Sequence, residues 1–275
     1  MAGKKFKDLN LKDAFLFAAA LQDAETCQMI LEIIFGKKLP KVNVHVEHGV
    51  FFSSDFRSIR LDVYASDATE ITYNLEMENW DKESLPKRSR YHQSEMDVTC
   101  LEPGRDYTDF KPSYVIFICT FDPFEQGLYR YRFENRCLER DFGLGDEAYK
   151  IFLNTRGNND EEVPKLLVDF LHYVEKSNDE YVETVSEAKI GQLHEKIRKL
   201  KESREWEARY MTFERLLQRT EEKGWQEGLQ EGRQVERQKM LKLMEYMVAA
   251  GEAEKLPELT KDETFLEEML KKYNL

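Results

Sequence analysis

The strongest constraint on the fold is a nearly continuous apolar run at residues 114–121, Tyr-Val-Ile-Phe-Ile-Cys-Thr-Phe. A run of this kind suits a strand that is buried on both faces of a sheet. Asp122-Pro123 and Gln126-Gly127 end the run, and residues 128–133 form one more predicted strand, whose partner we expect to be antiparallel. The core of this chain is therefore expected to contain a sheet with at least one fully buried strand.

Upstream of this strand, the apolar pattern changes from helical to alternating. Residues 8–36 repeat apolar side chains at three- and four-residue spacing and end at Gly36, which predicts a helix. Alternation from Val42 onward, and again at residues 57–65 and 70–79, predicts three strands, the last two joined by a polar hairpin loop. A helix is expected at residues 84–101. The predicted class is α/β, a mixed sheet flanked by helices.

The chain after Asn178 is long, charged and helical in pattern. A single helix over residues 183–248 would need a partner or its own domain to cover its apolar stripe. We predict three parts: a core domain at 1–178, a helical segment and candidate coiled coil at 179–248, and a short helical tail at 249–275. Self-association is expected through apolar side chains at near-heptad spacing, namely Leu193, Ile197, Leu200, Trp206, Tyr210, Phe213 and Leu217.

Two further patterns lie in this C-terminal part. Gly224, Gly228 and Gly232 repeat every four residues, and they either line one helix face for close approach of another backbone or form a flexible hinge between two helices. Near the end, Thr260 precedes Glu263 by three residues. This spacing predicts a capping box that opens a final short helix.

Composition and charge exclude several classes of protein. With 41% hydrophobic residues the chain is expected to fold, and a net charge of −12 argues against a generally basic nucleic-acid coat protein, so any nucleic-acid contact is local. The four cysteines show no Cys-x-x-Cys spacing, which favours reduced thiols and a cytoplasmic location. The apolar run at residues 14–21 is too short for export or for a membrane span. The sequence contains no glycine-rich phosphate-binding loop with Gly-Lys-Ser/Thr, so it does not indicate hydrolysis of a nucleotide triphosphate.

The candidate chemistry lies on the second and third predicted strands. Alternation puts Asp62 on one face of its strand, and Glu76 and Glu78 on one face of the next. If the strands pair with their apolar faces together, these three carboxylates converge. Like charges at contact distance repel, and a hard divalent cation removes that cost. The alternative is a solvated acidic strand face.

Ordered motifs along the chain resemble the PD-(D/E)XK nuclease superfamily and, within it, the Rpn-type recombination-promoting nucleases. The resemblance is strong to about residue 135 and looser beyond, where the Glu-Gly repeats near Gly224 are also similar. The motifs are Leu11-Lys12-Asp13-Ala14-Phe15, Arg60-Leu61-Asp62-Val63-Tyr64, Tyr73-Asn74-Leu75-Glu76-Met77-Glu78, Lys87-Arg88-Ser89-Arg90-Tyr91 and Pro103-Gly104-Arg105-Asp106-Tyr107.

This resemblance implies a restriction-endonuclease-like α-β-β-β-α-β core and a magnesium-dependent DNA endonuclease, with Mn²⁺ as an alternative ion. By position, Asp62 and Glu76 would bind the metal, with the Met77 backbone carbonyl as a further ligand. The metal would activate water for attack on a DNA phosphodiester. The basic residues of the next helix, Lys87, Arg88 and Arg90, would bind phosphate; the alternative for the lysine is a charge-balanced helix surface.

Position 78 departs from the family pattern. The family normally has glutamine there and the wider superfamily most often lysine, whereas this chain has Glu78. A third carboxylate can act as a general base or favour a second metal ion. The alternative is a catalytically inactive DNA- or protein-binding module that keeps the fold and oligomerises through its C-terminal helices.

Overall fold

The computed structural model describes residues 4–46, 51–52, 59–60, 63–80, 83–100, 104 and 106–275. The chain divides into two compact units, residues 1–211 and 212–275. Within the described residues, no helix combines the length and the apolar character that a bilayer-spanning segment requires. The predicted class is confirmed: the structure is α/β, with a mixed sheet flanked by helices and a long helical C-terminal extension.

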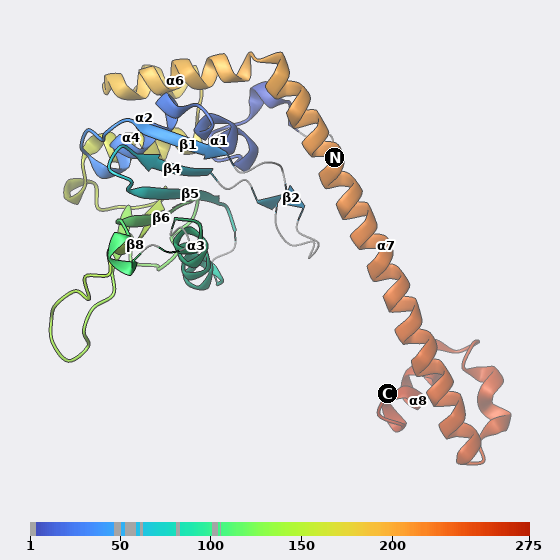
Figure 1. Ribbon diagram of the computed structural model, residues 1–275. Coiled ribbons are helices and arrows are strands. Elements are labelled where there is room, and N and C mark those ends of the chain that lie inside the picture. Colours follow the sequence, from blue (N-terminus) through green and yellow to red (C-terminus); the bar gives the residue numbers. More distant parts are fainter. Residues whose placement is uncertain are drawn as a thin grey trace. The chain divides into compact units, whose positions relative to one another are not determined.

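A six-stranded sheet forms the centre of the first unit (Figure 1). The pairs β1–β4, β4–β5 and β7–β8 are antiparallel, whereas β5–β6 and β6–β8 are parallel. The apolar run predicted as a doubly buried strand is β6, and all but one of its residues are buried. In sheet order the strands are β1 (Val42–Val46), β4 (Val63–Asp67), β5 (Thr72–Glu78), β6 (Ser113–Cys119), β8 (Ala148–Asn154) and β7 (Arg130–Phe133).

Helices cover both faces of this sheet. The face that carries Tyr73 and Tyr114 packs against α2 (Ala24–Phe35), where the Phe35 ring makes edge contacts with both tyrosines. On the same side lie α1 (Ala14–Leu21), which contacts β5, and α4 (Lys165–Glu175), which contacts α2. The opposite face packs against α3 (Leu85–Cys100), as Figure 1 shows.

Two predicted elements are divided in the structure. The helix expected at residues 8–36 is a short 3₁₀ turn, Phe6–Asp8, followed by the separate helices α1 and α2. Asp23 causes the second break, because its carboxylate accepts hydrogen bonds from Thr26 N (3.0 Å) and Thr26 Oγ1 (2.5 Å) and so caps the start of α2. The run at 57–65 contributes to two strands in different sheets, β4 and β3 (Ile59–Arg60), and β3 pairs with β2 (Phe51–Phe52).

The sequence patterns missed two elements of the first unit. Strand β8 supplies the antiparallel partner predicted for β7 and also continues the parallel part of the sheet beside β6. Helix α4 follows it and is buried along one side. Both come after a polar loop at residues 134–147, which shows no clear apolar periodicity before the strand.

The β4–β5 hairpin was predicted, and its turn is organised by the side chain of Asp67. Its Oδ1 accepts hydrogen bonds from Thr69 N (2.8 Å), Thr69 Oγ1 (2.6 Å) and Ile71 N (3.3 Å), and Oδ2 accepts one from the Tyr73 hydroxyl (2.9 Å). Burial, with the neighbouring Asp67 carboxylate, raises the pKa of Tyr73, so the phenol stays a donor. Asp67 thus fixes the turn that sets the register of β5.

We expect Asp67→Ala to lower the free energy of unfolding by about 2 kcal/mol, because it leaves buried donors of the turn without their acceptor. Urea unfolding followed by far-ultraviolet circular dichroism measures this loss. Asp67→Asn keeps one acceptor oxygen and should lose about half as much. Equal stability of the alanine variant and the wild type would contradict this role for Asp67.

The long charged segment is three helices, not one. These are α5 (Asp179–Glu183), α6 (Ala188–Lys201) and α7 (Arg204–Ala249). Leu193 and Ile197 of α6 are fully buried, and this helix contacts α1, α2 and α4. Residues predicted to mediate self-association therefore complete the core of the first unit, since its own helices cover this part of the apolar stripe.

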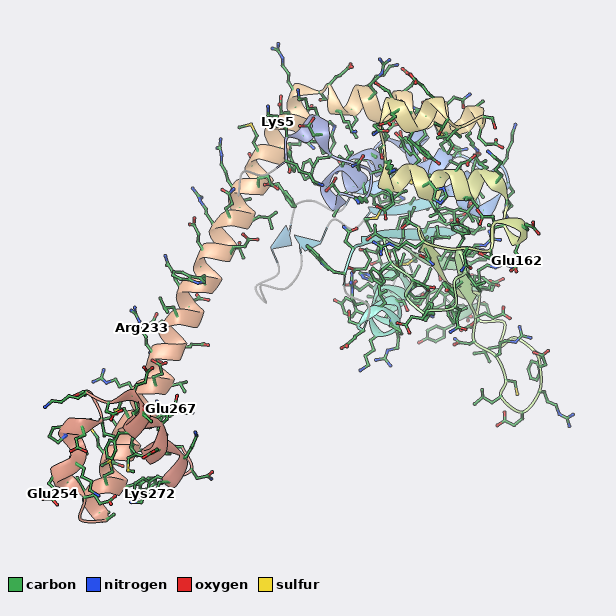
Figure 2. All side chains as sticks on the ribbon, turned by 180° about the vertical axis from the view of Figure 1, so that it is seen from behind. Lys5, Glu162, Arg233, Glu254, Glu267 and Lys272 are labelled. Atoms are coloured by element: carbon green, nitrogen blue, oxygen red, sulfur yellow. The ribbon has the colours of Figure 1, made fainter. Side chains whose placement is uncertain are left out.

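The second unit consists of the distal part of α7 and two short helices. Gly224, Gly228 and Gly232 lie within the continuous helix α7, so the structure contradicts the hinge alternative. The 3₁₀ segment Ala253–Glu258 and helix α8 (Glu263–Lys272) pack on the end of α7 through a core that contains Leu243 and Met247. Charged side chains, among them Glu254, Glu267 and Lys272, are exposed on this unit (Figure 2).

The final helix begins differently from the prediction. Asp262, not Thr260, caps α8, because its Oδ1 accepts hydrogen bonds from Thr264 N (2.9 Å) and Phe265 N (3.1 Å). Glu252 lies between α7 and the 3₁₀ segment, and it accepts hydrogen bonds from Lys272 Nζ (2.7 Å) and the Tyr273 hydroxyl (2.9 Å) at the end of α8. These contacts lower the pKa of Glu252 to about 2. The tail thus has its own capped and charge-paired structure.

Candidate functional site

The polar side chains of β5 share one face. Asn74, Glu76 and Glu78 alternate with apolar residues, as the sequence predicted, and they lie on the face covered by α3. In the parallel register, Glu76 is beside Phe117 of β6, and Glu78 is beside Cys119. The two carboxylates therefore border the apolar core formed between α3 and the sheet.

Glu78 is buried, with 5% of the residue exposed, and its charge is compensated. Its Oε1 accepts hydrogen bonds from Asn79 N (3.0 Å) and Trp80 N (3.1 Å), and its Oε2 forms an ion pair with Arg88 Nη1. The Arg88 guanidinium also lies over the Phe117 ring, 5.4 Å from the centroid. Arg88 thus supplies to this carboxylate the positive charge that a buried ion requires.

Glu76 is held by a different set of groups. Asn74 Nδ2 donates a hydrogen bond to Glu76 Oε1 (3.2 Å), and His92 Nε2 of α3 lies 4.0 Å from the same oxygen. Asn74 itself is fully buried, and its Oδ1 accepts no hydrogen bond from the residues that the structure describes. A buried amide oxygen of this kind is a hard donor atom beside a carboxylate, the type of ligand that Mg²⁺ takes.

Asp62 lies outside the described residues. Its chain neighbour Val63 is the first residue of β4 and pairs with Leu75, the residue before Glu76. Met77 lies between the two glutamates of β5, with its side chain on the opposite face. Within the described ranges, no group of three or more His, Cys, Asp or Glu side chains is arranged to hold a metal ion.

The three basic residues singled out from the sequence all lie on α3 but differ in surroundings. Arg88 points to the sheet and pairs with Glu78, whereas Lys87 and Arg90 are exposed. Cys119, the thiol closest to the glutamates in register, is fully buried. Burial, with the negative charge of Glu78, raises the pKa of its thiol, which keeps it protonated and unsuited to act as a nucleophile.

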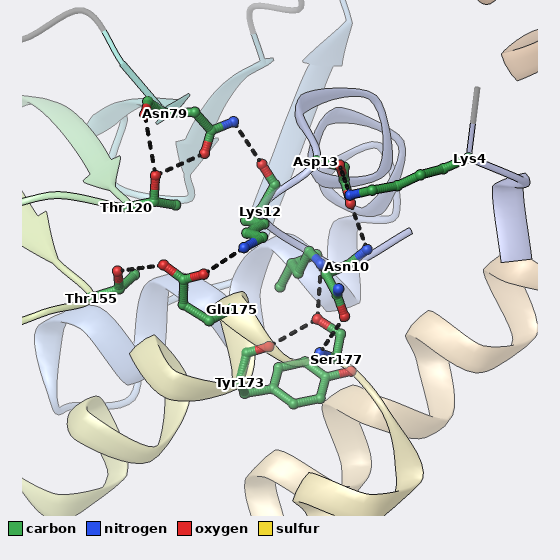
Figure 3. Close-up of polar contacts among 11 residues, drawn as sticks. Lys4, Asn10, Lys12, Asp13, Asn79, Thr120, Thr155, Tyr173, Glu175 and Ser177 are labelled. Carbon is green, nitrogen blue, oxygen red and sulfur yellow. Dashed lines mark hydrogen bonds and ion pairs between the residues drawn. The ribbon is translucent and has the colours of Figure 1, made fainter. Parts of the chain in front are cut away.

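Sequence reasoning missed a polar network at the carboxyl ends of β5, β6 and β8 (Figure 3). Asn79 Nδ2 donates to the Lys12 carbonyl (3.0 Å), and Thr120 Oγ1 donates to Asn79 Oδ1 (3.1 Å). Lys12 Nζ in turn pairs with Glu175 Oε2 (2.7 Å), while Thr155 Oγ1 donates to Oε1 (2.9 Å). The network ties the residue after Glu78 to the N-terminal segment and to α4.

The Glu175 carboxylate of this network stays ionised at neutral pH. Burial by itself opposes ionisation of Glu175, but the hydrogen bonds from Lys12 and Thr155 lower its pKa overall. The contact between Lys12 and Glu175 joins residues far apart in sequence, so local periodicity carries no signal for it. Only the motif that contains Lys12 pointed to this segment.

The family model for PD-(D/E)XK nuclease family transposases matches residues 52–217, which include β5, α3 and the glutamates described above. No curated protein and no solved structure matches the chain significantly.

Proposed function

Since this chain belongs to the PD-(D/E)XK nuclease family transposases, we propose that it is a divalent-metal-dependent DNA endonuclease that hydrolyses phosphodiester bonds in recombination, mobile-element or defence transactions. The observation that carries the proposal is the placement of Glu76 and Glu78 on one face of β5, under a helix that bears exposed basic residues. The family supplies the reaction class, and these residues supply a site for it.

The proposed metal ligands are Asp62, Glu76 and the Met77 carbonyl. The pairing of Val63 with Leu75 supports this set, because it joins the chain neighbours of Asp62 and Glu76 across two strands. The oxygen donors of the proposed site fit a hard cation such as Mg²⁺ or Mn²⁺, and they include Asn74 Oδ1, which has no hydrogen-bond partner among the described residues. When bound, such an ion lowers the pKa of water and neutralises charge on the phosphoryl group.

The remaining residues act around these ligands. Asn74 orients Glu76 by donating a hydrogen bond to its Oε1. Arg88 balances the charge of Glu78, and Lys87 and Arg90 of α3 are proposed to bind DNA phosphates. Because the chain carries a net charge of −12, this local basic surface would direct where DNA binds.

Nicking of supercoiled plasmid tests the proposal. Purified protein is incubated with plasmid in Mg²⁺, in Mn²⁺ and in excess EDTA, and nicked and linear products are separated on agarose. Product in either metal and none in EDTA is the expected result. The absence of product from folded wild-type protein in both metals would favour the inactive binding module, for which the Glu78–Arg88 pair in place of the family glutamine is the specific observation.

Orientation of Glu76 by Asn74 gives a further prediction. We expect Asn74→Ala to weaken Mn²⁺ binding by about tenfold, as loss of a hydrogen bond to a metal ligand typically does. Isothermal calorimetry measures the affinity directly. Asn43→Ala, at an exposed position of β1, is the matched control. Indistinguishable Mn²⁺ affinities for the two variants would exclude a role for Asn74 at the metal.

Self-association is proposed only for the distal part of α7. Leu193 and Ile197 are used within the first unit, whereas Trp225 and Leu229, one turn apart on α7, are exposed. Sedimentation of wild type and Trp225→Ala tests whether this part of the helix joins two copies.

A further inference from the structure

Trp80 is the most exposed aromatic side chain among the described residues, with 88% of the residue accessible. Exposure of this extent is unusual for tryptophan, which is highly buried on average. It lies two residues beyond Glu78, the last residue of β5. Its ring makes no aromatic or cation–π contact within the described part of the chain.

The backbone at Trp80 is fixed although its side chain is in solvent. Trp80 N donates to Glu78 Oε1 (3.1 Å). The preceding residue, Asn79, is held by the Lys12 carbonyl and by Thr120, as Figure 3 shows. An exposed ring on an anchored backbone loses little conformational freedom when it binds a flat ligand, which favours affinity.

The other two tryptophans have different surroundings. Trp206 packs edge-on against Phe15 at 6.1 Å, and the Arg209 guanidinium lies 4.7 Å from its ring centroid. Trp225 is exposed, but it belongs to the second unit. Trp80 is therefore the exposed tryptophan that adjoins the candidate site.

We propose that Trp80 is a stacking platform for an unpaired nucleobase of the DNA beside the bond to be cut. This inference rests on the proposed function for the position of that bond. An indole ring stacks on the face of any base, but the faces of paired bases inside a duplex are covered by their neighbours. The substrate class that fits is DNA with unpaired nucleotides, such as a single strand, a fork or a flap.

Tryptophan fluorescence tests the stacking directly. The double variant Trp206→Phe, Trp225→Phe leaves Trp80 as the single tryptophan of the chain. In EDTA, where cleavage cannot occur, a single-stranded thymidine oligonucleotide should quench its emission. An abasic oligonucleotide of the same length has the same phosphates and no bases, so it should leave the emission nearly unchanged. Equal quenching by both oligonucleotides, or by neither, would overturn the proposal.

Affinity measurements give an independent check. Stacking of one base is worth about 1–3 kcal/mol, so Trp80→Ala should weaken binding of the single strand by about fivefold or more, and Trp80→Phe should restore most of it. Binding of the matching duplex should change by less than about twofold. Leu138→Ala serves as the control for an exposed apolar side chain elsewhere, and circular dichroism confirms that each variant is folded. Unchanged single-strand affinity in Trp80→Ala would reject the platform.

These outcomes separate the inference from the nuclease proposal. If wild-type protein nicks plasmid but Trp80→Ala binds single strands as tightly as wild type, the nuclease stands and the platform falls. If no cleavage occurs but base-dependent quenching is seen, the reverse holds, and Trp80 binds unpaired bases for an inactive module.

Discussion

Glu76→Ala is expected to reduce metal-dependent plasmid nicking by at least about a thousandfold, which corresponds to about 4 kcal/mol of transition-state stabilisation. The reason is that Glu76 provides the carboxylate on β5 that is proposed to bind the metal, and water and backbone oxygens cannot replace its charge. Rates of nicking at saturating Mg²⁺ measure the loss. Asp62→Ala should have an effect of similar size.

Four comparisons sharpen this test. Glu161→Ala removes an exposed carboxylate from the 3₁₀ turn Asp160–Glu162 and should nick at the wild-type rate. Calorimetry with Mn²⁺ should show binding by wild type and by Glu161→Ala but not by Glu76→Ala. Thermal unfolding of Glu76→Ala should stay close to that of wild type, because the change also removes a carboxylate beside Glu78. Wild-type nicking by an Asp62→Ala, Glu76→Ala double variant would place the reaction elsewhere in the molecule.

Alternation along β5 made its polar face predictable from the sequence. The residues that contact this face from other elements could not be predicted in this way. Asn74, Glu76 and Glu78 share a face because side chains alternate along any strand, and the structure confirms it. The contact between Glu78 and Arg88 depends on how α3 packs across the sheet, and no local pattern encodes that packing. Similarly, Asn79 meets the Lys12 carbonyl only through the tertiary fold.

Errors in the predicted elements have the same physical origin. Apolar spacing continues across Asp23, so periodicity alone joined α1 and α2, but α1 ends at Leu21 and the Asp23 side chain caps the start of α2. The stripe that contains Leu193 has the spacing of a coiled coil, and that spacing does not reveal whether the partner is another chain or the same domain. Here α6 packs on its own domain.

The Glu78–Arg88 pair should have a large effect on stability. Arg88→Met is expected to lower the free energy of unfolding by about 3 kcal/mol, because it removes the guanidinium that pairs with a buried carboxylate. The estimate lies at the low end for buried pairs, since Arg88 is partly exposed and two backbone amides still donate to Glu78. Urea unfolding measures the loss.

Glu78→Gln distinguishes charge compensation from simple packing. A glutamine side-chain oxygen still accepts from Asn79 N and Trp80 N, so this variant should lose less than about 1 kcal/mol. If Arg88 acts mainly by compensating charge, adding Glu78→Gln to Arg88→Met should recover most of the lost stability, a coupling energy of about 2 kcal/mol. Additive losses in the double variant would show that Arg88 stabilises through its packing on Phe117 instead.

Glu78→Gln is expected to lower stability slightly but to strengthen DNA binding. Glu78→Gln removes one negative charge and frees the Arg88 guanidinium for a phosphate, so it should tighten duplex binding by up to about fivefold at low salt. In the Arg88→Met background, where no guanidinium is released, the gain should be smaller. Equal gains in both backgrounds would mean that Glu78 repels DNA through its charge alone. A gain confined to the Arg88 background would mean that Glu78 restrains the arginine, and that the glutamine typical of this family leaves it available for phosphate.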